Sequence, residues 1–491
     1  MTEAVNYKSA LIKGAFWTVG ARWTIKGIGF LNTAIMARLL MPADYGIVAM
    51  AMLVVGLIQA IVDFGASTAL LRKGTLDTDY IDSAWTLCLL QSVGIGVLVL
   101  AVSPLATLYF EEPRVQGILW VMAVCVPLNA ASNIGLALAQ KDLQFSLDFR
   151  ISVASRLLSV AVTLVAGFLL RDFRALVIGI CSNYVAQFVL SYVMHPYRPR
   201  WNIRRIPEIW RVTKWLLLAG VGAFLMRKSD EVIAARIGGA HDYGIYNVGA
   251  DLGSLPIGEL GPAMLRAFLP VLSSIKDDAE RTSRAVLKIF AAANSITLPI
   301  GSGVAAIAVP MTLVILGPKW TEAAVFVAGF ALVATAQFVM HPLNNLLLLR
   351  GFTRLQNRIV WVEVSVFIVA VAVLTPQMHV MGLLAARAAG AAANLGTTAY
   401  CACKYTSVTL KDILHSVWRP LSGAVLMHLL VAWVVQCTTE PVVQLLAGVA
   451  TGVMTYTVWL VCSWHMSGRP EGLESTVLDL LRKTLNIKIP P

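Results

Sequence analysis

The sequence predicts an all-α protein that crosses a membrane about fourteen times, and three observations support this fold class. Of the 491 residues, 58% are hydrophobic and only 13% are charged, with a mean hydropathy of +0.74. Soluble domains are about 25% charged. Apolar stretches of about 20 residues recur along the chain between Pro, Gly and charge clusters. These features exclude a soluble protein and leave no room for a sizeable soluble domain.

Each expected span is an apolar window of about 20 residues, long enough to cross a bilayer as a helix. The windows lie at 13–37, 46–70, 83–108, 117–139, 151–170, 175–194, 212–237, 244–272, 286–315, 321–348, 358–374, 380–402, 418–437 and 442–463. The longest polar stretch follows the sixth window. We therefore expect a six-helix lobe at 1–194, a basic linker at 195–211, a second six-helix lobe at 212–402, two further helices at 403–463 and a tail at 464–491.

The basic residues predict the orientation of these spans. Polytopic membrane proteins concentrate Lys and Arg in their cytoplasmic loops. With the N-terminus in the cytoplasm, twenty-six basic residues fall in cytoplasmic segments, six on the opposite side and seven inside spans. Both termini are therefore expected in the cytoplasm. The net charge of +12 follows from this topology, so no nucleic-acid partner is expected.

An internal repeat relates the two lobes. The segment IMARLLMPADYGI at 35–47 aligns without a gap with IAARIGGAHDYGI at 233–245. Both copies lie between an odd and an even span, six spans apart, so the repeat is parallel. The shared Asp-Tyr-Gly is expected in a tight turn, where Gly permits a positive φ or a close approach of two backbones.

Motifs of enzymes and ATP-driven pumps are missing from the sequence. There is no glycine-rich phosphate loop, no His-Glu-x-x-His, no Cys-x-x-Cys and no Gly-x-Ser-x-Gly. The seven cysteines lie in or beside apolar stretches and are expected to be small core residues. No His, Cys, Asp or Glu has the spacing of a metal site. We therefore expect no enzyme, no metal and no cofactor.

Ionisable residues inside the spans are the candidate functional residues, because a charge in hydrocarbon costs roughly 2.5 kcal/mol or more. Arg22 and Lys26 are four residues apart on one face of the first span, which holds no acidic residue. Two like charges on one face favour an anion. The seventh and eighth spans carry Arg227 and Arg266 at comparable positions.

Acidic residues and one further arginine complete the set of charges in the spans. They are candidates for ion coupling or for structural ion pairs, and they comprise Asp63, Asp230, Glu259, Glu363 and Arg387. Asp230 with Arg227, Glu259 with Arg266, and Glu363 with Arg387 are pairs that could simply allow helices to pack. Both interpretations stay open at this stage.

Several loop motifs resemble those of one family. They are ARLLMPADYGI with VDFGASTALLRK, then LAQKDLQFSLDFRISVASRLLS, and in the second half FLPVLSSIKDDAERTSRAV, LGPKW and LLLLRGFTRLQ. The chain resembles, from about Phe16 to Val435, the polysaccharide exporters or Wzx-type flippases, which share the MOP superfamily with MurJ lipid flippases and MATE antiporters. The branch looks like that of colanic acid and succinoglycan exporters.

This resemblance implies two lobes around a central cavity, two extra helices and alternating access. It implies as cargo a polyprenyl-diphosphate-linked oligosaccharide, moved to the periplasmic leaflet of the bacterial inner membrane for exopolysaccharide or lipopolysaccharide synthesis. Cations must face a diphosphate in a region of low dielectric. Helices 1, 7 and 8 line the cavity in related lipid flippases, so the substrate-binding candidates are Arg22, Lys26, Arg227 and Arg266. Polysaccharide polymerase and chain-length proteins are the candidate protein partners.

Two alternatives remain from the sequence. A MATE-like antiporter of small molecules would favour acidic groups for cationic substrates, whereas the first and seventh spans are mainly basic. A membrane subunit of a polysaccharide synthase complex would not transport at all.

Reporter fusions test the expected topology. We expect fusions within 195–211 to report a cytoplasmic location, and fusions at Asp44 and Asp242 to report the opposite side of the membrane. An external location of 195–211 would overturn both the orientation and the parallel repeat.

Overall fold

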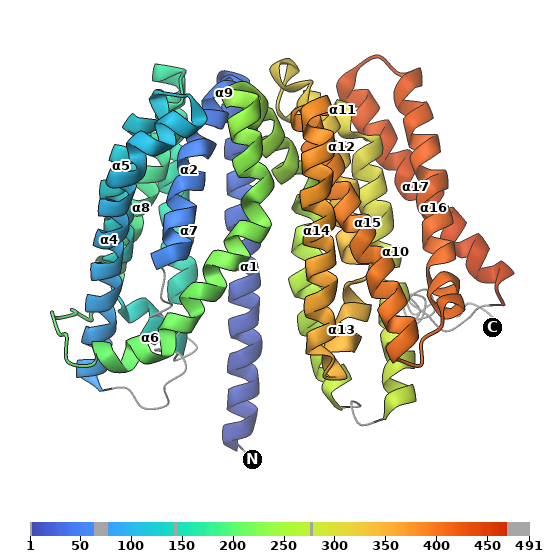
Figure 1. The fold of residues 1–491 in the computed structure, drawn as a ribbon, viewed down its shortest axis with the longest axis horizontal. Helices are drawn as coiled ribbons and strands as arrows, with labels where there is room; N and C mark the ends of the chain where they lie inside the picture. Colours follow the sequence, from blue (N-terminus) through green and yellow to red (C-terminus); the bar gives the residue numbers. More distant parts are fainter. Residues whose placement is uncertain (1, 63–76, 142–144, 275–277, 469–491) are drawn as a thin grey trace. The chain divides into compact units, whose positions relative to one another are not determined.

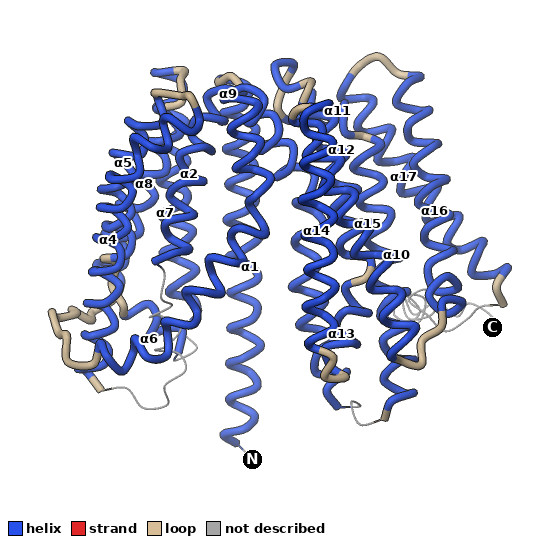
Figure 2. The backbone as a smooth tube through the Cα atoms, viewed as in Figure 1, coloured by secondary structure: helices blue, strands red, loops and turns tan. Residues whose placement is uncertain are grey.

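Helices make up nearly all of the structure. The computed structural model describes residues 2–62, 77–141, 145–274 and 278–468, and no strand occurs among them (Figure 2). The chain divides into two compact units, Met1–Gly244 (unit 1) and Ile245–Pro491 (unit 2). Helix α9 (Ile206–Ser274) belongs to both units (Figure 1). The all-α class predicted from composition is confirmed.

Unit 1 contains helices that pack as neighbours in pairs. Its helices before α9 are α1 (Thr2–Leu39), α2 (Pro42–Val62), α4 (Thr78–Phe110), α5 (Arg114–Ala130), α6 (Gly135–Lys141), α7 (Phe145–Leu170) and α8 (Arg174–Met194). Helix α7 packs against α1 and α8, and α4 packs against α5 and α2. Met36 and Leu40 at the end of α1 are buried with Ala166 and Ala175 of α7 and α8.

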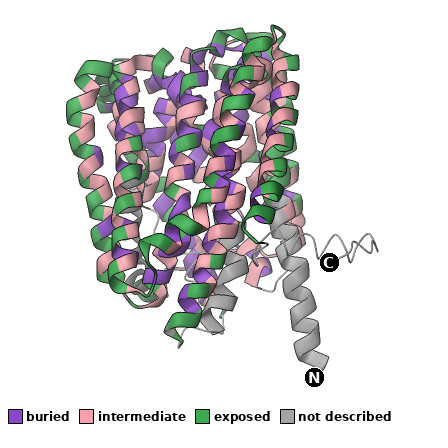
Figure 3. Ribbon diagram, turned by 90° about the vertical axis from the view of Figure 1, so that its right-hand side faces the viewer, coloured by how far each residue is buried: buried purple, intermediate pink, exposed green. Residues whose placement is uncertain are grey.

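Unit 2 continues with five helices of 26–28 residues and shorter ones between them. They are α10 (Ala279–Ala306), α11 (Ala308–Ile315), the 3₁₀ helix η1 (Pro318–Trp320), α12 (Ala323–Val339), α13 (His341–Leu349), α14 (Thr353–Met378), α15 (Val380–Tyr405), α16 (Leu410–Cys437) and α17 (Pro441–Met466). Helix α16 packs between α10 and α17, and α14 pairs with α15. Exposed residues run along the helices rather than only at their ends (Figure 3). Many are large and apolar, as lipid contact requires.

Nine of the described helices or helix pairs are long and apolar enough to cross a membrane, or ten if the bent pair of α5 and α6 is one span. The protein is therefore a multi-pass membrane protein. The expected span 286–315 is interrupted, since α10 gives way to α11 near Ile307. Helices α12 and α13 meet near Met340 but together form one candidate span, Ala323–Leu349, close to the expected 321–348. The count of fourteen and the five expected domains stay predictions. The tail beyond residue 468 lies outside the described residues.

The cysteines differ in part from the expectation. All seven are free; Cys125 and Cys401 are buried as predicted, but Cys437 and Cys462 are exposed on α16 and α17. Core placement was wrong for these two. A thiol is apolar enough to face lipid, so hydropathy alone does not separate a core cysteine from a lipid-facing one.

The Asp-Tyr-Gly motifs are helical in the structure, so the expected tight turns with positive φ are wrong. Asp44 lies in the first turn of α2, where its carboxylate accepts a hydrogen bond of 2.9 Å from the backbone N–H of Met41. The chain turns just before each motif instead, at Leu40–Met41 in the first copy and at Gly239 in the second. Gly239 has φ 63°, a conformation that glycine adopts without steric cost.

The glycines of the two motifs serve close approach. A Cβ at Gly46 would overlap the carbonyl oxygen of Ala240, and a Cβ at Gly244 would overlap that of Pro42. Pro42 and Ala240 occupy equivalent positions of the repeat, as do Gly46 and Gly244. The contact is thus reciprocal within unit 1, and each repeat packs its glycine on the other's backbone. Side chains at either glycine would separate the two helix starts.

Substitution of Gly46 by Ala tests this contact. We expect less folded protein and a lower Tm, because the methyl group meets backbone that cannot rotate away, and overpacking costs about 1–3 kcal/mol. Gly117→Ala on α5 is the matched control, since no atom lies within 4 Å of a Cβ there. Thermal unfolding in detergent measures both. Equal stability of the two variants would contradict the close contact.

Candidate functional site

The basic face of α1 is the first part of the candidate site. Arg22 and Lys26 are both exposed on consecutive turns. Gly29, seven residues after Arg22, lies on the same face two turns along the helix. A third cation meets α1 at this glycine.

Arg156 of α7 supplies that cation. Its Nη2 lies 2.8 Å from where a Cβ of Gly29 would be, so a larger residue there would displace the end of the guanidinium. The Nε atom of Arg156 is buried and has no hydrogen-bond partner among the described residues. The same holds for Oδ1 of Asn32, three residues after Gly29. Such atoms cost free energy unless a ligand or water satisfies them.

The substrate-binding candidates from the sequence omit Arg156 because they are confined to the first, seventh and eighth spans. Its signal is visible in the sequence, since the fifth window, 151–170, holds this arginine and no acidic residue. Its position near the face of α1 that carries Arg22 and Lys26 depends on the packing of α7 against α1, which the sequence does not show. We name Arg22, Lys26 and Arg156 the cationic cluster.

Several charged residues in the first part of α9 differ in their exposure and in their partners. Arg227 is exposed, whereas Asp230 is only 4% exposed. Lys228 forms a salt bridge with Glu231, and the hydroxyl of Tyr243 donates a hydrogen bond of 3.3 Å to the same carboxylate. In the first repeat, Tyr45 donates to the backbone oxygen of Thr33, the position equivalent to Glu231. Glu231 thus has a structural role that the repeat reproduces.

The remaining sequence candidates are only partly described. Asp63 lies outside the described residues, as does the side chain of Arg266, whose backbone belongs to α9. Glu259 is half-buried on α9 in unit 2. Their assignment as substrate-binding or coupling residues stays a prediction.

Glu363 and Arg387 lie on the packed pair α14 and α15. The amide of Asn394 donates a hydrogen bond of 2.7 Å to Oε2 of Glu363. The guanidinium carbon of Arg387 lies 4.9 Å from the ring centroid of Phe367, a cation–π contact. The hydroxyl of Thr398 in turn donates to Oδ1 of Asn394 or of Asn344, at 3.3 and 3.2 Å. This polar group joins α13, α14 and α15.

Unit 2 also encloses an apolar cavity of about 500 Å³. Helices α10, α12, α15 and α16 line it, mainly with Leu, Val and Ala. Its few polar groups include His428, whose Nδ1 lies 2.9 Å from the backbone oxygen of Ser302. This cavity suits a hydrocarbon chain and not a phosphate, because it has no cation in its wall.

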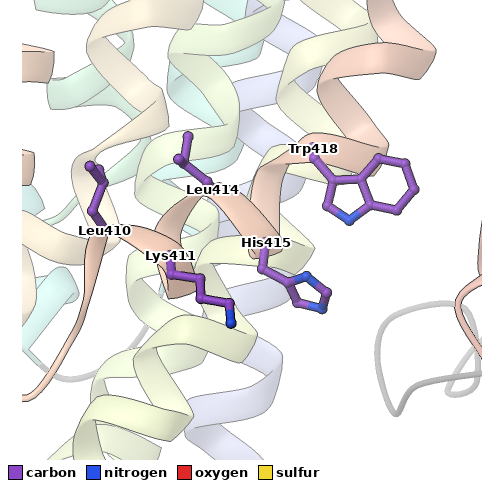
Figure 4. A pocket seen from close by; sticks show the side chains of 5 residues that line it. All are labelled: Leu410, Lys411, Leu414, His415 and Trp418. Carbon is purple, nitrogen blue, oxygen red and sulfur yellow. The ribbon is translucent and has the colours of Figure 1, made fainter.

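A shallow hollow lies at the start of α16. Leu410, Leu414 and Trp418 project from one side of the helix beside Lys411 and His415 (Figure 4). Thr409 and Asp412 form a capping box that begins the helix here. Exposed Leu and Trp next to Lys are typical of a helix end at the membrane surface. Within the described part of the chain, no group of three His, Cys, Asp or Glu side chains could hold a metal ion.

These helices, several of which carry charged side chains, define a class, the multi-pass helical membrane proteins. The structure is similar to that of the lipid II flippase MurJ in an inward closed conformation, with a TM-score of 0.70, 11% identity and coverage of 93% of this chain and 100% of that one. It is also similar to a multidrug resistance MATE transporter of the MOP superfamily, with a TM-score of 0.54, 15% identity and coverage of 80% and 94%. At such identities both likenesses show the fold alone.

The chain belongs to a family of polysaccharide biosynthesis proteins, which matches residues 35–325. Its relatives include the succinoglycan biosynthesis transport protein ExoT of Rhizobium meliloti, 24% identical over 66% of this chain and 66% of that protein. The lipopolysaccharide biosynthesis protein WzxC of Escherichia coli is 21% identical over 71% of each chain. A membrane protein of the cps region of Klebsiella pneumoniae is 23% identical over 74% and 76%. The family predicted from the loop motifs is confirmed.

Two substitutions separate the structural and coupling roles of Glu363. We expect Glu363→Ala to lower stability by about 1–2 kcal/mol, because the amide of Asn394 loses its acceptor in the protein interior. Glu363→Gln keeps an oxygen acceptor and should unfold at nearly the wild-type temperature. If Glu363→Gln also transports normally, the residue is structural. Normal stability with lost transport would show that its charge is needed for coupling.

Proposed function

We propose that this protein is a flippase for a polyprenyl-diphosphate-linked oligosaccharide, which it moves from the cytoplasmic to the periplasmic leaflet for exopolysaccharide or lipopolysaccharide synthesis. The cationic cluster in unit 1 carries the proposal. Arg156 lies on a helix long and apolar enough to cross the membrane, Arg22 lies in the first expected span, and a charge is seldom kept in a span without a function. The names of the relatives ExoT and WzxC agree with this cargo.

The cationic cluster fits a diphosphate by charge and by hydrogen bonding. Three cations on two packed helices can hold two phosphates, and the planar guanidinium of Arg156 can donate two parallel hydrogen bonds to one of them. Its unsatisfied Nε atom would gain an acceptor at the same time. Arg227 is a further exposed cation of unit 1, and Arg266 of α9 is proposed to join them.

Release requires that binding is not too tight. Acidic groups near the cations can compete for them and weaken the hold on the phosphates. Asp230 and Glu259 are the proposed competitors, and with Asp63, Glu363 and Arg387 they are the proposed coupling residues. Glu231 is already occupied by Lys228 and Tyr243, so it is a poor competitor.

The finer architecture is part of the proposal. It comprises fourteen spans in two six-helix lobes around a central cavity, with two further helices, and alternating access. The proposed location is the bacterial inner membrane with both termini in the cytoplasm, as the distribution of basic residues favours. The protein would act as a transporter without a catalytic step of its own. Polysaccharide polymerase and chain-length proteins are proposed partners.

Reconstitution of the purified chain in liposomes tests the function. A flippase alone makes a lipid-linked oligosaccharide in the inner leaflet accessible to a reagent outside. A synthase subunit would leave it inaccessible, and a MATE-like antiporter would instead exchange a small cation for protons or sodium. Either result would overturn the proposal. In cells, the lipid-linked sugar that accumulates when the protein is removed identifies the cargo.

Substitutions in the cationic cluster test the diphosphate site. We expect Arg22→Ala and Arg156→Ala each to lower the flipping rate roughly tenfold or more, since each removes a charged hydrogen bond of about 1.5–3 kcal/mol. Arg174→Ala is the control, because Arg174 is exposed at the start of α8 and pairs with Asp172. Rates are measured in liposomes at equal protein amounts. Wild-type rates for both cluster variants would place the diphosphate elsewhere, and full rescue by Lys would show that charge suffices without bidentate geometry.

A further inference from the structure

The polar segment between α8 and α9 is a docked structure in unit 1. We name residues 195–205 the basic strap. The hydroxyl of Tyr197 donates a hydrogen bond of 2.7 Å to Oδ1 of Asp82, and the amide of Asn202 donates one of 2.8 Å to Oδ1 of Asp79. Backbone N–H groups of Arg200 and Arg205 donate to Asp82 and Ser83. These bonds fix the strap along the first turns of α4.

Buried groups hold the other end of the strap. The side chain of Asn133 donates a hydrogen bond of 2.6 Å to the backbone oxygen of Tyr197, and Asn133 is 1% exposed. Burial raises the pKa of the Tyr197 phenol above its ordinary value, and the bond to Asp82 acts in the same direction. The phenol therefore stays a donor at neutral pH. Burial and the nearby charge of Arg198 lower the pKa of His195, so its ring is neutral.

The strap lies at the depth of the lipid headgroups. Helix α4 has 33 residues and is therefore about 50 Å long, whereas the hydrocarbon core of a bilayer is about 30 Å thick. A centred, untilted helix of this length would extend about 10 Å beyond the hydrocarbon at each end. The strap contacts α4 between Asp79 and Thr86, within about 12 Å of its start at Thr78. It also directly follows the end of α8 at Met194.

The outward side of the strap combines cations with large apolar side chains. Arg198, Arg200, Trp201 and Ile203 are exposed, the last two at 60% and 59%. Arg198 donates to the neutral backbone oxygens of Tyr192, His195 and Tyr197. The side chain of Arg200 has no ion pair among the described residues, although its backbone binds Asp82. Neither arginine is paired with a carboxylate among the described residues, although the guanidinium carbon of Arg198 also lies 5.7 Å from the ring centroid of Tyr192.

The other charges at this surface are paired with one another. Arg205 forms salt bridges with Asp77 at 3.1 Å and with Glu208 at 3.6 Å. Arg204 lies 4.0 Å from Asp79. Asp82 is 9% exposed and is already bonded to the strap. Asp77, Asp79 and Glu208 thus pair with Arg204 and Arg205, whereas neither Arg198 nor Arg200 forms a salt bridge among the described residues.

We propose that the basic strap is a binding site for an anionic phospholipid. Arg198 and Arg200 bind the phosphate of the headgroup, and Trp201 and Ile203 enter the boundary between headgroups and acyl chains. Trp prefers this depth, and basic residues next to a span attract anionic lipid by about 1 kcal/mol each. An acidic soluble protein fits less well, because the strap lies directly beside a membrane span. The exposed side chains of Trp201 and Ile203 would contact lipid there.

Lipid titration of the purified protein in neutral detergent tests this site. We expect phosphatidylglycerol to bind more tightly than phosphatidylcholine, as native mass spectrometry and the rise of Tm measure. Arg198→Gln with Arg200→Gln should weaken binding of phosphatidylglycerol about tenfold or more, and Arg200→Gln alone about three- to fivefold. Arg171→Gln with Arg174→Gln is the matched control, since it removes two exposed charges from the opposite ends of α7 and α8. Glycerol phosphate, which lacks acyl chains, should not raise Tm.

Three results would overturn the proposal. They are equal binding of both lipids by the wild type, unchanged binding by the double variant, and equal loss in the double variant and its control. A Tm shift by glycerol phosphate as large as that by the lipid would assign the site to a soluble anion instead. Arg200→Gln guards against misfolding, because the Arg200 side chain makes no hydrogen bond in the described structure. None of these readouts depends on transport, so the proposed flippase function can stand or fall separately.

Discussion

The cost of a charge in hydrocarbon is the constraint on which the rest of this structure depends. It makes the backbone helical, because every N–H and C=O must be bonded within the protein. It also makes each charged side chain in a span informative. Glu363 accepts a hydrogen bond from the amide of Asn394, and Glu231 forms a salt bridge with Lys228 and accepts a hydrogen bond from Tyr243. Arg156 differs, since its Nε atom is buried without an acceptor. The cationic cluster is therefore the proposed ligand site.

The two copies of the repeated motif contact each other in the structure. The two glycines pack reciprocally on backbone of the other copy, and each of the two tyrosines bonds the residue twelve positions earlier in the chain, Thr33 on α1 or Glu231 on α9. Such close contact between backbones excludes side chains and fixes the approach of the two helix starts. Sequence similarity between copies is thus preserved where geometry is demanding. The acceptors of the tyrosines differ, a backbone oxygen in one copy and Glu231 in the other.

The basic strap shows how tertiary contacts separate charges that look alike in a sequence. Four arginines follow one another between α8 and α9. Two of them pair with carboxylates at the start of α4, while Arg198 and Arg200 face outward. The buried bonds of Tyr197 and Asn133 determine this division, because they set which side of the extended chain faces the protein. A stretch expected to be a linker is thus a fixed surface.

The sequence by itself determined the all-α membrane class, the family, the repeat and the basic face of α1, because hydropathy, loop motifs and helical spacing are local properties. It could not place Cys437 and Cys462, which face outward although their windows are apolar. It also assigned the Asp-Tyr-Gly motifs to turns, since Asp and Gly favour turns locally and the helix is stabilised by packing. Only the tertiary structure showed that Arg156 packs on Gly29 of α1, on the face that carries Arg22 and Lys26. Only the tertiary structure showed that the strap binds α4. Both contacts link residues distant in the chain, and no local pattern encodes which helices will pack together.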